Sequence, residues 1–356
     1  MKKILVLGMT DNIGGIETFY MTYYREIIKK GYVIDFATVF KNMAFEDEIR
    51  KNGGTIYILP NFKKNTIGYK RKLSEIIENN KYDVVHYNML SAANIIPLKI
   101  AKKLGVKNII AHSHNTNIPN ILIKRILHNY NKNKIKKYAN NLIACSKDAG
   151  KWMFNNEKFT ILNNAIECQK FYFNHDVRTK LRKKYNITDK QVVIGHIGKM
   201  CEQKNHKFLI DVFKEICDSY ENYKLILVGV GELENDIRFQ VKKNKLEDKV
   251  IFLGRRTDVN DVMNMFDIFV LPSLFEGLGI VLVEAQANGL KCFASNIPDE
   301  VMINANIEKL DLNIIEWKNK ITQTKNNNRI KKLSKSIEEY DINLQKKKLE
   351  NIYNKY

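Results

Sequence analysis

Short apolar runs alternate with amphipathic segments along the whole chain. The runs that read as buried strands are "KILVLGM", "VIDFATV", "DVVHYN", "NIIAHSH", "NLIACS", "QVVIGHIG", "KLILVGVG", "KVIFLG", "DIFVLPS" and "KCFAS". Stretches with apolar residues at helical spacing lie between them, and we predict helices over Glu17–Lys30, Phe45–Asn52, Ala92–Leu104, His206–Tyr220 and Glu232–Asn244. A glycine follows three of these segments, at Gly31, Gly53 and Gly105, where a left-handed residue commonly ends a helix.

This alternation predicts the fold class. Continuous apolar strands joined by helices are typical of parallel sheets that are covered on both faces. A length of 356 residues favours two domains over one. We therefore predict an α/β protein of two doubly wound, Rossmann-like domains over residues 1–168 and 169–329, with the break inside Ala165–Lys190. A lysine-rich segment with apolar residues at helical spacing follows and predicts a last helix over about 330–356.

The composition also indicates the cellular compartment of the protein. The five cysteines are scattered without a C-x-x-C pair, which indicates a reducing compartment instead of a disulfide framework or a zinc site. No apolar run approaches the length of a transmembrane helix. The apolar part of "MKKILVLGMT" is too short for a signal peptide. We expect a cytoplasmic protein.

The formal net charge of +20 favours anionic partners, which are nucleic acids, phosphorylated substrates or an acidic membrane face. A nucleic-acid-binding protein would explain the charge, but the sequence holds no recognition motif for one. The segment "NIPNILIKRILHNYNKNKIKKYANN" combines Ile, Leu and Tyr with many Lys and Arg residues. This pattern is typical of a basic amphipathic helix on an anionic membrane. A solvated helix with an apolar core face fits it equally well.

Ligands of open parallel sheets bind beyond the carboxyl ends of the strands, so residues that directly follow strands are candidates. Gly14 and Gly15 precede a helix, where glycines let a ligand approach the backbone and a helix N-terminus attracts phosphate. Lys199 and Lys204 follow another strand and would neutralise a diphosphate, and Asn205 is placed to cap the next helix. An ordinary tight turn explains Gly14 and Gly15 equally well, and a solvated basic turn explains Lys199 and Lys204 equally well.

Two further strand ends carry weaker signals. His112 and His114 end the "NIIAHSH" strand, too close together for an H-x-x-x-H metal pair and without a carboxylate nearby in sequence. Gly229 and Gly231 read as a simple turn. None of the glycine-containing turns discussed here matches G-x-G-x-x-G or the P-loop pattern, which argues against a dinucleotide or NTPase site.

The stretch "PSLFEGLGIVLVEAQANGL" carries two acidic residues in apolar surroundings. Its centre has strand-like propensity, whereas "EAQANG" reads as the end of a helix with a glycine stop. As a helix from about Gly279 to Asn288 it would bury most of its circumference, and a buried carboxylate requires a partner. Because carboxylates only accept hydrogen bonds, Glu276 and Glu284 facing one pocket suit a ligand with several hydroxyls. Two alternatives remain. The two residues could be the catalytic carboxylates of a glycosidase, or each could be paired with a nearby helix cap or lysine.

Glu276 and Glu284, with seven residues between them, resemble the E-x7-E motif of glycosyltransferase family 4. The order and spacing of further segments are similar to bacterial polysaccharide members of that family over nearly the whole chain: "NIGGIETF", "AHSHNT", "ACSKDAGKWMF", "ILNNAIE", "EQKNH", "LVGVGELE" and "FVLPSLFEGL". The resemblance implies a GT-B fold, in which two Rossmann-like domains face each other across a cleft and a C-terminal helix returns to the first domain. It also implies retaining transfer of a sugar from a nucleotide-sugar, without a metal or other cofactor.

The resemblance implies a role for each matching residue. We expect Glu284 to accept from the ribose hydroxyls and Glu276 from the donor sugar, with Lys199 and Lys204 on the diphosphate. His114 is expected near the reacting sugar, so that His114 and Glu276 are the expected catalytic residues. The backbone that is expected to complete the donor site belongs to Gly14, Gly15, Gly277, Leu278 and Gly279.

The sequence departs from the family pattern in three places. Lys199 stands where an arginine is usual, which keeps the charge but loses a two-pronged hydrogen-bonding group. Ala165 replaces a common glycine and Lys291 a common proline, and we interpret both as structural drift.

The resemblance also indicates partners. We expect a UDP-sugar donor, a lipid-diphosphate-linked glycan as acceptor, and an anionic membrane surface at the inner face of the plasma membrane, with no nucleic acid. A nucleotide-sugar epimerase and a non-catalytic accessory subunit of the same fold are the alternatives. The intact Glu276 and Glu284 pair argues against loss of the donor site. The sequence gives no oligomeric state.

Overall fold

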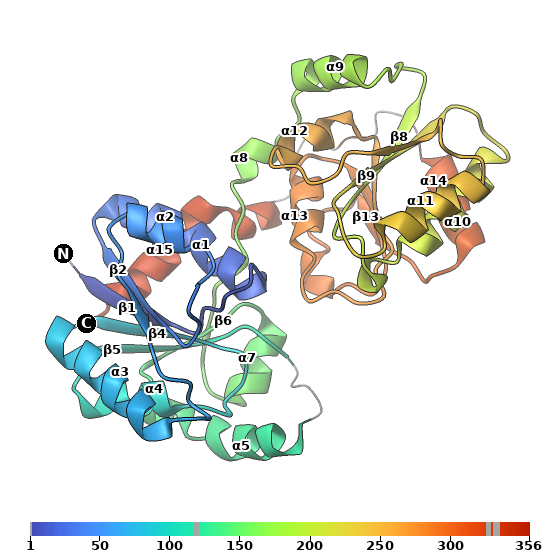
Figure 1. Cartoon of the computed structure of the whole chain (residues 1–356). Coiled ribbons are helices and arrows are strands. Elements are labelled where there is room, and N and C mark those ends of the chain that lie inside the picture. Colours follow the sequence, from blue (N-terminus) through green and yellow to red (C-terminus); the bar gives the residue numbers. More distant parts are fainter. Residues whose placement is uncertain (1, 117–120, 325–328, 330–334) are drawn as a thin grey trace. The chain divides into compact units, whose positions relative to one another are not determined.

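The computed structural model describes residues 2–116, 121–324, 329 and 335–356 (Figure 1). The chain forms two compact units, Met1–Ile166 together with Ile342–Tyr356, and Glu167–Asp341. None of the five cysteines forms a disulfide. Within the described ranges, no helix combines the length and the apolarity that crossing a membrane requires.

The first unit is built on a seven-stranded parallel sheet with the order β3-β2-β1-β4-β5-β6-β7. Its strands are β1 (Lys3–Leu7), β2 (Val33–Thr38), β3 (Ile56–Ile58), β4 (Val84–Met89), β5 (Asn108–Ser113), β6 (Asn141–Ala144) and β7 (Thr160–Ile161). Its helices are α1 (Gly15–Ile27), η1 (Ile28–Lys30), α2 (Glu46–Lys51), α3 (Thr66–Asn80), α4 (Ile96–Lys103), α5 (Leu122–Lys132), α6 (Ile135–Tyr138), α7 (Lys147–Phe154) and α15 (Ile342–Tyr353).

Helices cover both faces of this sheet because successive strand residues point to opposite sides. Ile4 and Val6 of β1 pack with α1 and α15 on one face. Leu5 and Leu7 pack with α3, α4 and α7 on the other face. The unbroken apolar run of β1 is therefore buried on both sides, as its sequence predicted.

The second unit is built on a six-stranded parallel sheet with the order β10-β9-β8-β11-β12-β13. Its strands are β8 (Val192–Ile197), β9 (Tyr223–Val228), β10 (Val250–Phe252), β11 (Ile268–Leu271), β12 (Lys291–Ala294) and β13 (Ile307–Lys309). Its helices are α8 (Cys168–Phe171), α9 (His175–Lys184), η2 (Glu202–Lys204), α10 (His206–Cys217), α11 (Glu234–Lys243), α12 (Val259–Val262), η3 (Met263–Met265), α13 (Ile280–Ala287), η4 (Asp299–Val301), α14 (Ile314–Gln323) and η5 (Lys335–Tyr340).

The structure contains every predicted strand and adds β3, β7 and β13, which the sequence did not indicate. All three additional strands are two or three residues long and lie at sheet edges. The predicted helix ends are confirmed, because Gly31, Gly53 and Gly105 have φ values of 82°, 84° and 73°.

Two local predictions are wrong. Asn205 stands before α10 but does not cap it with its side chain, because Asn205 also ends the η2 turn and has a left-handed backbone with φ of 51°. The predicted single helix over about 330–356 is interrupted, since Lys335–Tyr340 is a 3-10 helix and α15 begins at Ile342. Only Ile342–Tyr356 of that segment belongs to the first unit, and residues 330–334 lie outside the described ranges.

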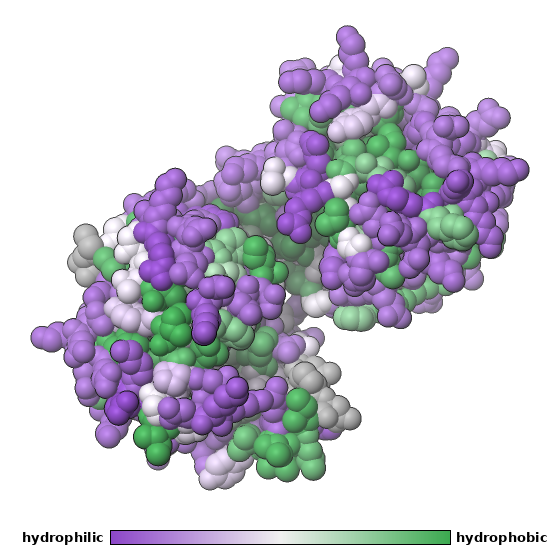
Figure 2. Space-filling view, in the orientation of Figure 1, coloured by the Kyte–Doolittle hydropathy of each residue, from purple (hydrophilic) through white to green (hydrophobic). Residues whose placement is uncertain are grey.

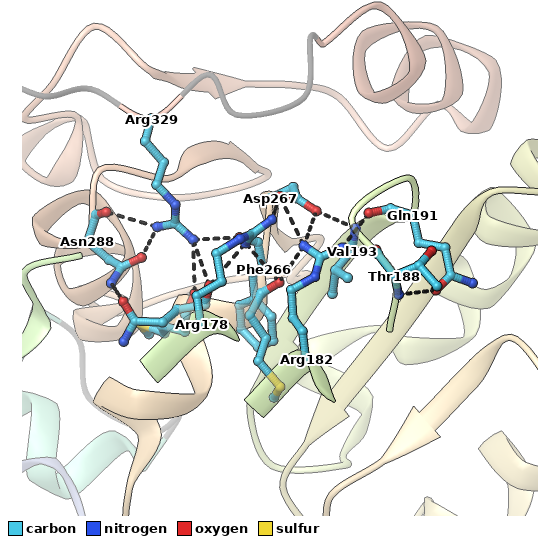
Figure 3. Close-up of polar contacts among 12 residues, drawn as sticks. Arg178, Arg182, Thr188, Gln191, Val193, Phe266, Asp267, Asn288 and Arg329 are labelled. Carbon is cyan, nitrogen blue, oxygen red and sulfur yellow. Dashed lines mark hydrogen bonds and ion pairs between the residues drawn. The ribbon is translucent and has the colours of Figure 1, made fainter. Parts of the chain in front are cut away.

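An arginine cluster around Asp267 fixes the amino end of β11 (Figure 3). The Asp267 carboxylate contacts Arg178 at 2.5 Å and Arg182 at 3.2 Å, and it also accepts from the backbone N–H of Val193 at 2.7 Å. Arg329 donates to the carbonyl of Phe266 at 2.5 Å. This cluster ties α9 to the start of the strand whose other end leads into the candidate site.

Candidate functional site

The loop after β8 carries Lys199 and is seated by the two glycines that follow β9. A Cβ atom on Gly229 would lie 2.0 Å from the carbonyl oxygen of Gly198, and one on Gly231 would lie 2.2 Å from that of Met200. Both glycines are therefore required for close packing of two strand-end loops. The interpretation of this pair as a simple turn missed that contact.

Lys199 lies at the surface beside Glu232, with 2.8 Å between Nζ and a carboxylate oxygen. Both side chains are mostly exposed. The hydrogen bond from Lys199 lowers the pKa of Glu232. Exposed pairs of this kind are weak, so Lys199 is held only loosely and is free to turn toward an anion.

Lys204 and Glu276 meet directly, although 72 residues separate them in sequence. Lys204 Nζ donates to Glu276 Oε1 at 2.5 Å, and the side chains are 16% and 5% exposed. The hydroxyl of Ser273 donates to the same oxygen at 2.5 Å. The structure thus brings together Lys204, which is predicted to bind the diphosphate, and Glu276, which is predicted to bind the donor sugar.

Helix α13 begins at Ile280, directly after Gly279, whose φ is 71°. No side chain caps its first turn, so the backbone N–H groups at this end are suited to an anion. Gly277, Leu278 and Gly279 form the approach to it and are at least partly exposed. The helical prediction for this segment is confirmed, and most of its residues are buried as expected.

Glu284 differs sharply from its neighbour Gln286 on α13. Gln286 is buried and donates to the carbonyls of Leu282 and Val301 at 3.0 and 2.7 Å. Glu284 is partly buried, and its side chain forms no hydrogen bond or ion pair with any residue in the described part of the chain. Burial raises the pKa of Glu284 to about 8. An acidic side chain that is desolvated and lacks a protein partner is typical of a ligand-binding site.

In the first unit, Gly14 and Gly15 stand at the start of α1. Glu17 closes this turn, since its carboxylate accepts from the N–H groups of Thr10 at 2.9 Å and Gly14 at 3.2 Å. A Cβ atom on Gly15 would meet no atom within 4 Å. Packing in the protein itself therefore does not require glycine at position 15.

His114 directly follows β5 and is held by its neighbours. Its Nε2 lies 2.8 Å from the amide oxygen of Asn88, which assigns the proton to Nε2 and leaves a lone pair on Nδ1. Its ring contacts Phe19 of α1 at 5.0 Å between centroids. Burial lowers the pKa of His114 to about 3, so the ring is neutral at physiological pH.

A buried row of polar side chains lies behind His114. His86 Nδ1 is 2.8 Å from the Tyr353 hydroxyl, and His86 Nε2 is 3.0 Å from His112 Nδ1. The Tyr353 hydroxyl is also 2.9 Å from that of Tyr20. This row links α15 and α1 to strands β4 and β5. His86 and Asn88, two polar residues at alternate positions of β4, could have indicated buried polar contacts here from the sequence.

The described residues contain no group of three or more His, Cys, Asp or Glu side chains arranged to hold a metal ion. In the second unit the structure brings Lys204 and Glu276 together just before the start of α13, whereas Lys199 contacts Glu232. Gly15 and His114 of the first unit are linked through Phe19 on α1.

The chain is similar to proteins of known family. Residues 13–170 match the family described as Glycosyltransferase Family 4, and residues 177–344 match Glycosyl transferases group 1. The protein named "Putative glycosyltransferase EpsF" of Bacillus subtilis is 32% identical over 313 residues, which cover 83% of this chain and 79% of EpsF. A UDP-Gal:alpha-D-GlcNAc-diphosphoundecaprenol alpha-1,3-galactosyltransferase of Escherichia coli is 27% identical over 63% of this chain and 60% of its own length.

Solved structures show the same fold at lower identity. HepE of Anabaena in complex with UDP-glucose is 17% identical, with a TM-score of 0.76 and coverage of 100% of both chains. A glycosyltransferase of Rickettsia africae is 18% identical, with a TM-score of 0.80 and coverage of 99% of this chain and 98% of its own. The chain therefore belongs to glycosyltransferase family 4 and is a glycosyltransferase with the GT-B fold.

Proposed function

We propose that the protein transfers a sugar from a UDP-sugar to a glycan carried on a lipid diphosphate, in the synthesis of a bacterial capsule or exopolysaccharide. The observation that carries this proposal is the cluster of Lys204, Glu276 and the uncapped start of α13, the helix that bears Glu284. Two named proteins support the choice of substrates: HepE, solved with UDP-glucose, and the Escherichia coli relative, whose name includes a diphosphoundecaprenol acceptor.

In the proposed complex each donor group meets a complementary side chain. Glu284 accepts from the ribose hydroxyls, and Glu276 accepts from a hydroxyl of the donor sugar. Lys199 and Lys204 lie against the diphosphate and stabilise the negative charge that develops on UDP as it leaves. These two ammonium groups supply the positive charge, so the proposed reaction needs no metal ion or other cofactor.

The proposed transfer retains the anomeric configuration. The bond between the anomeric carbon and the diphosphate oxygen breaks while the acceptor oxygen forms its bond on the same face of the sugar. The acceptor proton passes to the departing phosphate oxygen, which balances charge and protons. His114 is neutral, so its Nδ1 lone pair accepts from a hydroxyl near the reacting carbon and orients the sugar.

Helix α5 supplies the proposed contact with an anionic membrane at the cytoplasmic face. Its buried residues are His128 and Asn131, whereas Leu122, Ile123 and Tyr130 are 70%, 69% and 64% exposed. The space-filling view shows hydrophobic residues gathered over this helix (Figure 2). The apolar side chains of α5 are therefore not turned to the core, whereas Ile135 and Ala139, later in the same segment, are buried in it. Exposed apolar residues among lysines and arginines suit a lipid surface with anionic headgroups. The first residues of the predicted segment, 117–120, lie outside the described ranges.

A transfer assay tests the proposal. Radiolabelled UDP-glucose and UDP-galactose are incubated, with and without EDTA, with the protein and vesicles that contain undecaprenyl-diphosphate-linked N-acetylglucosamine. We expect label from one donor to enter the lipid fraction at a rate that EDTA does not change, and Glu284→Ala to abolish the signal. Conversion of a UDP-sugar without acceptor would instead indicate an epimerase, and inactivity of a folded protein that binds donor would indicate an accessory subunit.

A further inference from the structure

The η2 turn and the loop over residues 273–276 are joined at three consecutive points. The backbone N–H of Leu274 donates to the carbonyl of Gln203 at 2.8 Å. The side-chain amide of Gln203 donates to the carbonyl of Phe275 at 2.9 Å. Lys204 then donates to Glu276 Oε1 at 2.5 Å. The turn that carries Lys204 and the loop that carries Glu276 therefore move as one piece.

A second set of hydrogen bonds holds the same loop from the side of β12. Ser273 is fully buried, and its carbonyl accepts from the hydroxyl of Ser295 at 2.8 Å. The backbone N–H of Glu276 donates to the carbonyl of Asn296 at 3.2 Å. Leu274 and Phe275 at the tip are 40% and 62% exposed. Because these apolar side chains are not packed in a core, the polar contacts fix the position of the loop.

The two carboxylate oxygens of Glu276 have different surroundings. Oε1 accepts from both Lys204 and the Ser273 hydroxyl, each at 2.5 Å. Oε2 has no hydrogen-bond partner in the described part of the chain. A carboxylate oxygen with two close donors is oriented strongly, since hydrogen bonds to charged groups are the strong ones. The orientation of the carboxylate thus leaves Oε2 as the oxygen that is available to a ligand.

We propose that Gln203 and Ser273 are positioning residues that hold the carboxylate of Glu276 so that Oε2 meets a hydroxyl of the donor sugar. Gln203 fixes the loop through Phe275, and Ser273 fixes the carboxylate itself. This inference rests on the proposed function and goes beyond it by naming two residues that act on the sugar only through Glu276. Their side chains donate to the loop and to Glu276, not to Lys204, so we expect their loss to affect recognition of the sugar more than recognition of the nucleotide.

The test compares affinity for UDP with affinity for UDP-glucose and UDP-galactose, measured by calorimetry on the full chain. The variants are Gln203→Met, which keeps the length of the side chain but removes its donor, and Ser273→Ala. Gln240→Met is the matched control, because Gln240 donates to Asp211 at 2.7 Å and to the carbonyl of Lys207 at 3.1 Å in the same unit.

We expect Gln203→Met and Ser273→Ala to bind UDP within about twofold of the wild type, while affinity for the preferred UDP-sugar falls roughly tenfold. Gln240→Met should keep both affinities. Unchanged affinity for the UDP-sugar in both variants would overturn the inference, and so would equal losses for UDP and the UDP-sugar, which a merely structural role predicts. A wild-type protein that binds UDP but gains nothing from any attached sugar would refute the role of Glu276 itself. A wild-type protein that binds neither would refute the proposed function.

Discussion

Replacing Glu284 with glutamine separates the contribution of this residue to function from its effect on stability. Glu284 is desolvated and has no partner in the described part of the chain, and burial raises its pKa from 4.5 to about 8. Burial penalises the ionised form, so the folded state is favoured most when Glu284 is protonated. That contribution is complete below the unfolded pKa near 4.5 and is lost as the pH rises through about 8.

The size of the effect follows from the pKa. One pKa unit corresponds to about 1.4 kcal/mol, so the rise from 4.5 to about 8 sets an upper bound of roughly 5 kcal/mol on the destabilisation above pH 8. Glu284 is partly exposed, and water screens part of this penalty. We expect about 2 kcal/mol at pH 9, which corresponds to about 4–8 °C in the melting temperature of a unit of this size.

The assay is a melting curve at pH 5 and pH 9, together with the affinity for UDP. Glu284→Gln should melt at a higher temperature than the wild type at pH 9 and at nearly the same temperature at pH 5. At pH 9, where Glu284 is ionised, the variant should also bind UDP at least tenfold more weakly, because the glutamine has lost the charge that the ribose hydroxyls meet. The matched control is Glu276→Gln, which should lower the melting temperature because it removes the ion pair with Lys204.

One outcome would refute this reasoning directly. If Glu284→Gln were less stable than the wild type at pH 9 and bound UDP normally, Glu284 would be a structural residue with a partner of its own. Its assignment to the ribose would then be wrong.

Three further predictions follow from the same structure. His114→Ala should lower the rate of transfer at least tenfold but change UDP affinity less than twofold, because His114 is assigned to the reacting sugar; equal losses in the two measurements would contradict this. Ile123→Asp should weaken sedimentation with anionic vesicles severalfold without lowering the melting temperature, whereas Ile67→Asp, at an even more exposed apolar position, should leave vesicle binding unchanged. Asp267→Asn should destabilise the protein by about 3 kcal/mol in denaturant titrations, since it leaves one buried and one largely buried arginine without their carboxylate, whereas Asp258→Asn at a partly exposed pair should cost less than about 1 kcal/mol.

The sequence predicted the central strands because they are mostly apolar and are buried on both faces. It did not predict β3, β7 and β13, because edge strands of two or three residues have too few positions to show a period. The prediction of a cap at Asn205 failed for a different reason. Residue type indicates a preference, but the backbone of Asn205 is set by the turn that precedes it.

The candidate site was predicted only as far as its residues lie in recognisable segments. The spacing of Glu276 and Glu284 indicated both residues, and the structure adds that Glu276 contacts Lys204 and Ser273 while the Glu284 side chain has no partner in the described part of the chain. Ser273, Gln203 and Asn88 were missed because their partners come from loops or strands that are distant in sequence. Such contacts are set by the register of neighbouring strands, and no local pattern encodes them.

The measurement that tests the central claim most directly is calorimetric titration of the wild-type protein with UDP, GDP and a panel of UDP-sugars, repeated with Glu284→Ala. The account predicts that the wild-type protein binds UDP more tightly than GDP, prefers one UDP-sugar, and loses at least tenfold in affinity in the variant. Equal binding of UDP by the variant, or no binding of any nucleotide by a folded wild-type protein, would contradict the account.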